Sequence, residues 1–153
     1  MIKQIFFAIE NKLKAHVYFA AWNFFRAFSD KNTGTQNKAK APFLRLVFKN
    51  EVARAINSQN VAIEKTAFFV LDIVKDQQVT DKDDLARMQT LEDITKAIEQ
   101  AILYPQDNEY IGLNYVKEIR INSAFEEMED ITKIENIVIN YEIEVDYLRT
   151  LRG

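Results

Sequence analysis

The side chains most often used in catalysis are scarce in this chain, and their spacing supports little chemistry. His16 is the only histidine and cysteine is absent, so a Ser-His-Asp triad would depend on this one imidazole. A Cys-His pair, a multi-histidine metal site and a zinc-thiolate site all lack their residues. We interpret His16 instead as a basic residue at the end of the first predicted helix, where positive charge suits the helix dipole.

Two groups of carboxylates could in principle bind a cation or act as an acid-base pair. Asp81, Asp83 and Asp84 lack the glycine and the distal glutamate of an EF-hand loop, and they suit the start of a helix. The second group lies in a polar connection with no apolar pocket apparent beside it and consists of Glu126, Glu127, Glu129 and Asp130. We therefore predict no metal ion, no cofactor and no enzymatic activity.

Nucleotide and nucleic-acid binding are also disfavoured. The chain has three glycines, too few and too scattered for a phosphate-binding loop. The net charge of −3 argues weakly against nonspecific binding to phosphates. An aromatic cluster could stack on bases, but only Arg26 is interleaved with its members, which are Trp22, Phe24, Phe25 and Phe28. We predict that these rings belong to the core or to subunit contacts, with no specific nucleic-acid partner.

Charge is unevenly distributed along the sequence. Between Lys31 and Arg54 the chain is basic, and Glu51 is its only acid. Between Glu126 and Asp146 it is acidic, and Lys133 is its only base. Two interpretations remain open at this point: both segments are solvated surface, or they form complementary patches that meet between copies of the protein.

The elements that must position these residues fit one domain over residues 1–153. Hydrophobic residues make up 48% and charged residues 28%, a balance typical of soluble globular proteins. Glu10 and Lys12 interrupt the apolar residues at the start, so no signal peptide is apparent. No run approaches the roughly 20 apolar residues that span a bilayer, and we predict no membrane partner.

Two segments have apolar residues at helical spacing. The first runs from about Ile2 to Ala15 and the second from about Asp84 to Leu103, where Pro105 stops it. The aromatic segment His16–Phe25 favours a strand over an extended arm, and Asn50–Asn60 could be a helical turn or an irregular strand. Residues 29–41 are polar and without periodicity, which predicts a mobile loop.

The remaining periodic segments predict strands. Pro42 introduces Phe43–Phe48, and Val61–Asp76 is apolar enough to be buried on both faces and therefore central. Gly112–Asn122 predicts a strand with a bulge near Val116. In Ile137–Tyr147 an apolar row (Ile139, Tyr141, Ile143, Val145, Tyr147) alternates with a polar row (Asn140, Glu142, Glu144, Asp146).

One solvated sheet face indicates an antiparallel or mixed sheet. The order of helix, strands, helix, strands predicts an α+β fold, with one mostly antiparallel or mixed sheet and both helices packed on one face.

This succession of elements resembles the phage tail terminator and tail-completion proteins, including prophage-encoded relatives. The resemblance rests on the Ile2–Leu13 helix with its aromatic Tyr18–Asn23 arm, the Pro42–Phe48 strand, and the Phe68–Val74 strand followed by the Leu91–Ile98 helix. The closing strands, joined by an acidic connection, complete it. It covers most of the chain as an order of elements and contains no diagnostic motif.

The resemblance implies a structural protein that caps or completes the tail tube and joins it to the head connector. It implies a homo-oligomeric ring, commonly of six copies, with tail-tube and head-connector partners. The location would be the bacterial cytoplasm during assembly and then the virion tail. Lys38, Lys40 and Arg45 on one side, and the polar row Asn140, Glu142, Glu144 and Asp146 on the other, are the candidate contact residues.

A second function stays open at the level of sequence. A small α+β domain from a mobile element or a bacterial regulator could bind a ligand or partner in an aromatic-lined cleft. Tyr18, Trp22 and Phe25 would line that cleft.

Overall fold

The computed structural model describes residues 1–26, 42–57, 62–76, 84–125 and 136–150. The described chain forms helices α1 (Ile2–Ala15), η1 (Val17–Phe19) and α3 (Asp84–Ile102), and strands β1 (Asn23–Arg26), β2 (Phe43–Asn57), β3 (Ala62–Asp76), β4 (Val116–Phe125) and β5 (Asn136–Thr150). The strands form one sheet in the order β1-β2-β3-β5-β4. Only β1 pairs in parallel, with β2, so the sheet is mixed and the predicted α+β class is confirmed.

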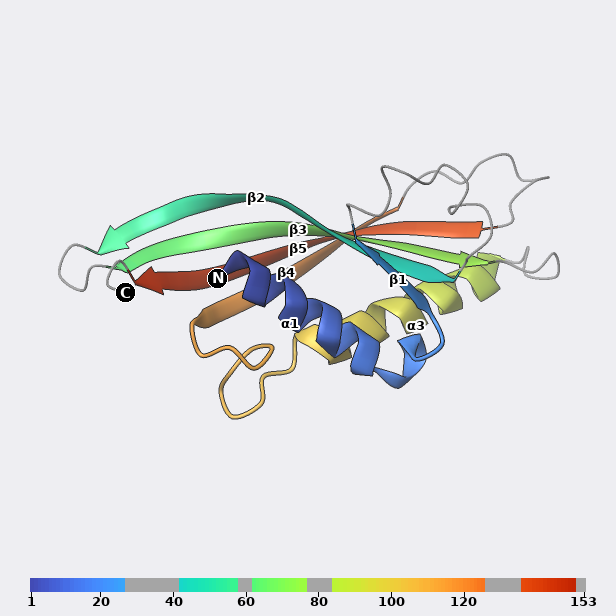
Figure 1. The fold of residues 1–153 in the computed structure, drawn as a ribbon. Helices are drawn as coiled ribbons and strands as arrows, with labels where there is room; N and C mark the ends of the chain where they lie inside the picture. Colours follow the sequence, from blue (N-terminus) through green and yellow to red (C-terminus); the bar gives the residue numbers. More distant parts are fainter. Residues whose placement is uncertain (27–41, 58–61, 77–83, 126–135, 151–153) are drawn as a thin grey trace.

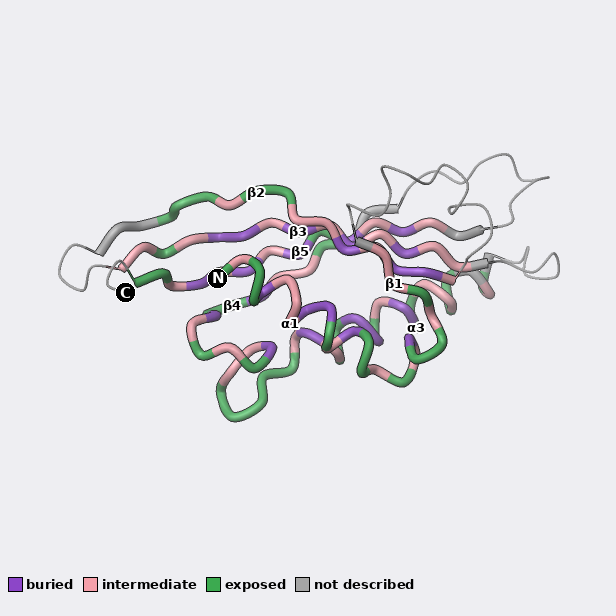
Figure 2. The backbone as a smooth tube through the Cα atoms, in the orientation of Figure 1, coloured by how far each residue is buried: buried purple, intermediate pink, exposed green. Residues whose placement is uncertain are grey.

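Both long helices lie on the same side of the sheet, beneath it in Figure 1. α1 turns Ile5, Ile9 and Leu13 into the core, each without exposed surface, because these residues recur every four positions. α3 contributes Ile94, Ala97, Ile98 and Ile102 in the same way. Figure 2 shows buried positions recurring along the central strands and along the helices beneath them. The core therefore lies between the sheet and the helices.

The helix predictions are confirmed closely. α1 has the predicted bounds, and α3 ends at Ile102, one residue before the predicted Leu103. The aromatic segment after α1 differs from the predicted strand. It begins with the short helix η1, because the His16 Nδ1 accepts a hydrogen bond from the backbone N–H of Tyr18 at 3.1 Å. Only Asn23–Arg26 is extended there.

β3 is central in the sheet, as predicted, but the prediction that both its faces are buried is wrong. Ala67, Phe69 and Leu71 face the helices and are at most 1% exposed, whereas Phe68 and Val70 on the other side are half-buried. The apolar run therefore does not mean two covered faces. Its outward members lie on a sheet face that no described helix covers.

Two irregularities in the strands are informative. The ambiguous Asn50–Asn60 segment is strand as far as Asn57, with register shifts between Phe48 and Asn50 and between Ala53 and Ala55. The predicted Gly112–Asn122 strand starts later, at Val116, and a register shift to Glu118 lies at the predicted bulge. The residues before it form turns, in which Gly112 adopts a positive φ of 73°.

Several predictions fall outside the described residues. These are the loop over residues 29–41, which includes Lys38 and Lys40, the aspartates Asp81 and Asp83, and the acidic connection over residues 126–133.

Candidate functional site

The polar row of β5 lies on the sheet face opposite the helices, which we call the open face. Ile139, Tyr141, Ile143, Val145 and Tyr147 are at most 1% exposed on the helix side, as their alternation predicts. Asn140, Glu142, Glu144 and Asp146 therefore point the other way, opposite Asp72, Val70, Phe68 and Thr66 of β3. The predicted alternation of an apolar row and a polar row along β5 is confirmed.

Arg120 of β4 connects three carboxylates on the open face. Its guanidinium donates to both carboxylate oxygens of Asp146, at 2.6 and 2.9 Å, and to Glu144 at 3.0 Å. It also donates to Glu118 at 2.9 Å. These bonds hold the pKa of Asp146 below its ordinary value and raise the pKa of Arg120. We call this set, together with Thr66 and Arg54, the Arg120 network.

The network extends to β2 through a buried hydroxyl. Thr66 has no exposed surface, and its Oγ1 donates to Asp146 Oδ1 at 2.5 Å. The same oxygen accepts a hydrogen bond from Arg54 Nε at 2.9 Å. Four neighbouring strands, β2, β3, β5 and β4, are thereby joined by side chains on the open face.

Arg45, predicted to lie on the basic side of a contact, is on this same open face. Its guanidinium donates to Asp72 Oδ2 at 2.7 and 3.0 Å, and Asp72 stands opposite Asn140. The structure therefore brings Arg45 together with the predicted acidic row and pairs much of that charge within the chain. Glu142 is exposed, and no described residue forms an ion pair with it.

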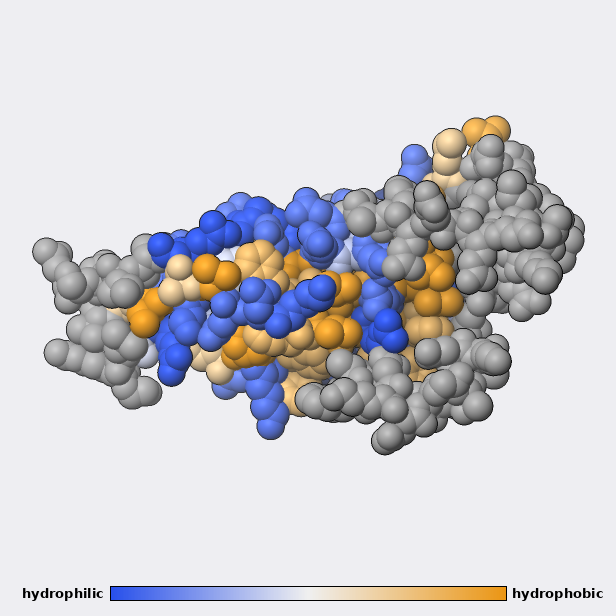
Figure 3. Space-filling model, turned by 90° about the horizontal axis from the view of Figure 1, so that it is seen from above, coloured by the Kyte–Doolittle hydropathy of each residue, from blue (hydrophilic) through white to orange (hydrophobic). Residues whose placement is uncertain are grey.

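Apolar side chains share the open face with these charges. Val47 of β2 stands opposite Val70 of β3, and Phe68 lies next to Glu144 in the pairing with β5. All three are half-buried. Figure 3, which looks onto this face, shows hydrophobic surface in its middle with hydrophilic surface beside it. An apolar centre with a charged surround is the usual composition of a protein interface.

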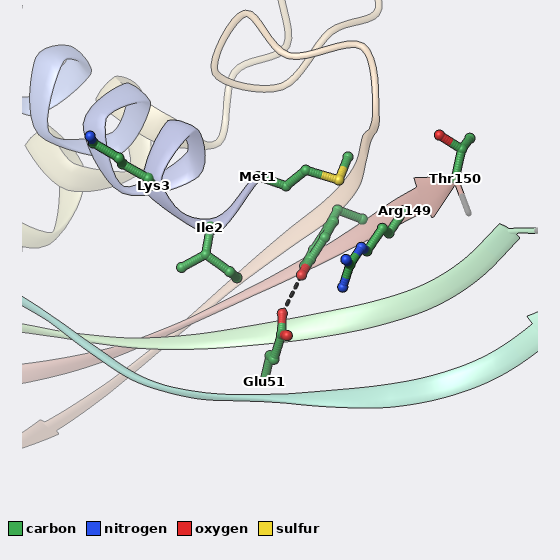
Figure 4. A pocket seen from close by; sticks show the side chains of 7 residues that line it. Met1, Ile2, Lys3, Glu51, Arg149 and Thr150 are labelled. Atoms are coloured by element: carbon green, nitrogen blue, oxygen red, sulfur yellow. Dashed lines mark hydrogen bonds between the residues drawn. The ribbon is translucent and has the colours of Figure 1, made fainter. Parts of the chain in front are cut away.

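The helix side of the sheet has a hollow of about 660 Å³ at the start of α1, lined by Met1, Ile2, Lys3, Glu51, Tyr147, Arg149 and Thr150. Figure 4 shows these side chains, with a dashed line for the bond that the Tyr147 phenol donates to the Glu51 carboxylate. Lys65 Nζ contacts the same carboxylate at 2.9 Å. Sequence reasoning missed this hollow because its residues come from three separate elements.

The chemistry of this hollow favours a structural contact. Burial and the nearby Glu51 raise the pKa of Tyr147, so its phenol stays protonated and acts as a donor. The bonds from Tyr147 and Lys65 lower the pKa of Glu51. A general base works best with a pKa near the working pH, and both shifts move away from that range.

The three residues of the predicted aromatic cleft lie in two different environments. Tyr18 and Trp22 pack against the core, with their ring centroids 5.7 Å apart. Phe25 instead contacts Phe43, at 5.3 Å between centroids, and stands opposite Arg45. His16, the lone histidine, has its Nε2 3.0 Å from Gln100 Oε1.

Among the described residues, no cluster of three or more histidine, cysteine, aspartate or glutamate side chains has the arrangement to hold a metal ion. Within the same part of the chain, no helix is both long and apolar enough to cross a membrane. No protein-family model matches this chain, and a comparison with curated proteins finds none that is similar to it.

Proposed function

We propose that this chain is a non-catalytic structural protein that works by associating with copies of itself and with other assembly proteins. The specific assembly is a phage tail, in which the protein caps or completes the tail tube and joins it to the head connector. On this proposal it acts in the bacterial cytoplasm during assembly and then stays in the virion tail.

One observation carries the interaction role. The sheet has α1 and α3 on one side only, and its open face combines half-buried apolar residues with charged ones. Covering Val47, Phe68 and Val70 would remove further apolar surface from water, worth roughly 25 cal/mol per Å². The exposed Glu142 beside them would then select the partner by charge.

The Arg120 network supports a prearranged surface. Arg120, whose side chain is 34% exposed, forms ion pairs with Asp146 and Glu144. These ion pairs hold both carboxylates in place before any partner binds. Fixing side chains in advance lowers the entropy lost on binding. A rigid charged surface suits repeated association with identical neighbours.

The tail role rests on the resemblance in the order of elements. The described chain preserves that order, from α1 and the aromatic arm through β2, β3 and α3 to the closing strands β4 and β5. No binding or catalytic chemistry among the described residues requires a different role. A structural protein of this kind needs stable surfaces and no reactive centre.

Gene disruption followed by electron microscopy tests the proposed tail role. The gene is disrupted in its source genome, any resident prophage is induced, and particles are imaged by negative-stain electron microscopy. Overlong tails, or tails separated from heads, are expected, and the wild-type gene supplied in trans should restore normal particles. Normal, infectious particles from the disrupted strain would refute the tail role.

A further inference from the structure

Two strands of the sheet have long edges that no described strand covers. β1 pairs with β2 only over Phe43–Leu46, although β2 continues to Asn57. At the other end of the sheet, β4 pairs with β5 on one side only, along Val116–Phe125. A free edge presents backbone N–H and C=O groups in a row and can pair with a strand of another chain.

The directions of the strands decide which edges fit together. β2, β3, β5 and β4 follow one another in antiparallel pairs, so β2 and β4 run in opposite directions. When a second copy is placed beside the first in the same orientation, its β4 is therefore antiparallel to the first copy's β2. Antiparallel pairing is the slightly more stable ladder.

We propose that copies of this chain associate edge to edge, with β2 of one copy paired to β4 of the next, so that the sheet continues across the boundary. This inference rests on the proposed self-association and adds the two strand edges to the open face as contact surfaces. The contact joins two different edges and is head-to-tail, which closes into a ring when the rotation per copy permits.

The charges near the two edges favour this pairing over two equal edges. Lys49 is exposed on β2 near its uncovered stretch, and so is Arg54, although its Nε donates to Thr66 within the chain. Near the β4 edge, the three carboxylates of Glu118, Glu144 and Asp146 surround the single guanidinium of Arg120. The exposed Lys117 lies within the register shift between Val116 and Glu118. Pairing β2 with a second β2 would bring cations together, and like charges directly opposite each other destabilise a sheet.

The two register shifts of β2 limit where the new ladder is regular. They lie on either side of Asn50–Ala53, which pairs with β3 without interruption. Bulges commonly restrict what an edge strand accepts. Val52, 44% exposed and central in this stretch, is therefore the position at which a neighbouring strand should lie closest.

Disulfide trapping tests the contact directly, because the chain contains no cysteine. Two single variants, Val52→Cys on β2 and Asn122→Cys on β4, are purified, mixed and oxidised. In a parallel mixture Glu118→Cys replaces Asn122→Cys, which covers a second register of β4 against β2. Within one chain the two strands are three strand spacings apart, about 14 Å, beyond the ~7 Å limit between Cα atoms for a disulfide. A covalent dimer therefore requires two copies.

We expect at least ten times more disulfide-linked dimer in one of the β2–β4 mixtures than in either single variant alone. The matched control mixes Val52→Cys with Glu92→Cys, an exposed position on α3. Equal cross-linking of Val52→Cys with itself would overturn the proposal in favour of paired β2 edges. Absence of cross-links in both β2–β4 mixtures would overturn the edge-to-edge contact. If native mass spectrometry then still shows oligomers, self-association through another surface remains. If it shows only monomers, self-association is refuted as well.

Discussion

Replacing Arg120 with methionine should destabilise the monomer measurably. The change keeps much of the apolar stem but removes a guanidinium that donates to Asp146, Glu144 and Glu118. The three remaining carboxylates repel each other and lose the guanidinium as their shared donor, although Thr66 still donates to Asp146. We therefore expect this substitution to lower the stability of the folded monomer, apart from any effect on the proposed assembly.

The magnitude follows from how far these groups are exposed. The side chains of Asp146 and Glu144 are 16% and 24% exposed, between a surface pair and a buried one. Surface ion pairs contribute roughly 0–1 kcal/mol, and removing one partner of a buried pair costs about 3–5 kcal/mol. We expect Arg120→Met to lower the free energy of unfolding by about 2 kcal/mol, equivalent to roughly 4–8 °C in Tm.

The pH dependence gives a second readout. Hydrogen bonds from Arg120 are the largest cause of the lowered pKa of Asp146 in the folded protein. Its contribution is therefore present above the unfolded pKa of about 4 and is lost as pH falls through the folded value. The stability difference between the wild type and Arg120→Met should narrow as pH falls below 4.

Urea denaturation from pH 7 to pH 3, followed by circular dichroism, measures both effects. The matched control is Lys117→Met, an exposed lysine on the same strand, which should change stability by no more than about 0.5 kcal/mol. A difference for Arg120→Met that stays constant across this pH range would refute the reasoning, as would wild-type stability at pH 7.

Three further predictions concern the core, the hollow and the open face. Leu71→Ala should cost about 3 kcal/mol in urea denaturation, because its side chain is fully buried at the centre of the sheet; a loss below 1 kcal/mol would contradict the described packing. Tyr147→Phe removes a hydrogen bond to Glu51, so it should raise the pKa of Glu51 and lower the free energy of unfolding by about 1 kcal/mol at pH 7, and by less in acid. NMR titration measures the pKa, and urea denaturation measures the stability. An unchanged pKa of Glu51 would exclude the hydrogen bond between Tyr147 and Glu51. Glu142→Lys should leave the monomer's Tm unchanged, because this carboxylate is exposed, yet weaken assembly in sedimentation experiments; unaltered assembly would remove the acidic row from the contact.

Local patterns in the sequence were sufficient for much of the fold. Apolar residues at helical spacing located α1 and α3 within one residue at their ends. The alternation along β5 identified which side chains enter the core, because side-chain direction in a strand depends on local geometry alone. The irregularity after Val116 was also predictable from its local pattern.

Features that depend on pairing were not predictable in the same way. Arg120 and Asp146 lie on different strands, and only the register of β4 against β5 brings them together. The same holds for Glu51 and Tyr147, whose contact depends on β3 lying between their strands. Phe68 looked like core because hydrophobicity alone does not say whether a helix covers a face.

The predicted contact residues show the same limit. Arg45 and Glu144 were assigned to opposite sides of a contact from sequence charge, whereas the sheet places both on the open face with partners inside the chain. Reversing the charge of Glu144 would therefore disturb folding as well as the proposed assembly. Glu142 is the cleaner probe of the two.

Self-association is tested most directly by the mass of the wild-type chain in solution across a range of concentrations. Native mass spectrometry, supported by sedimentation velocity, should show a discrete closed oligomer at a fixed multiple of 17.9 kDa, with six copies expected from the resemblance. Disrupting the β2 edge with Val52→Pro should reduce that species while circular dichroism still shows a folded chain. A protein that remains monomeric at the highest concentrations, alone and with purified tail-tube protein, would contradict the account.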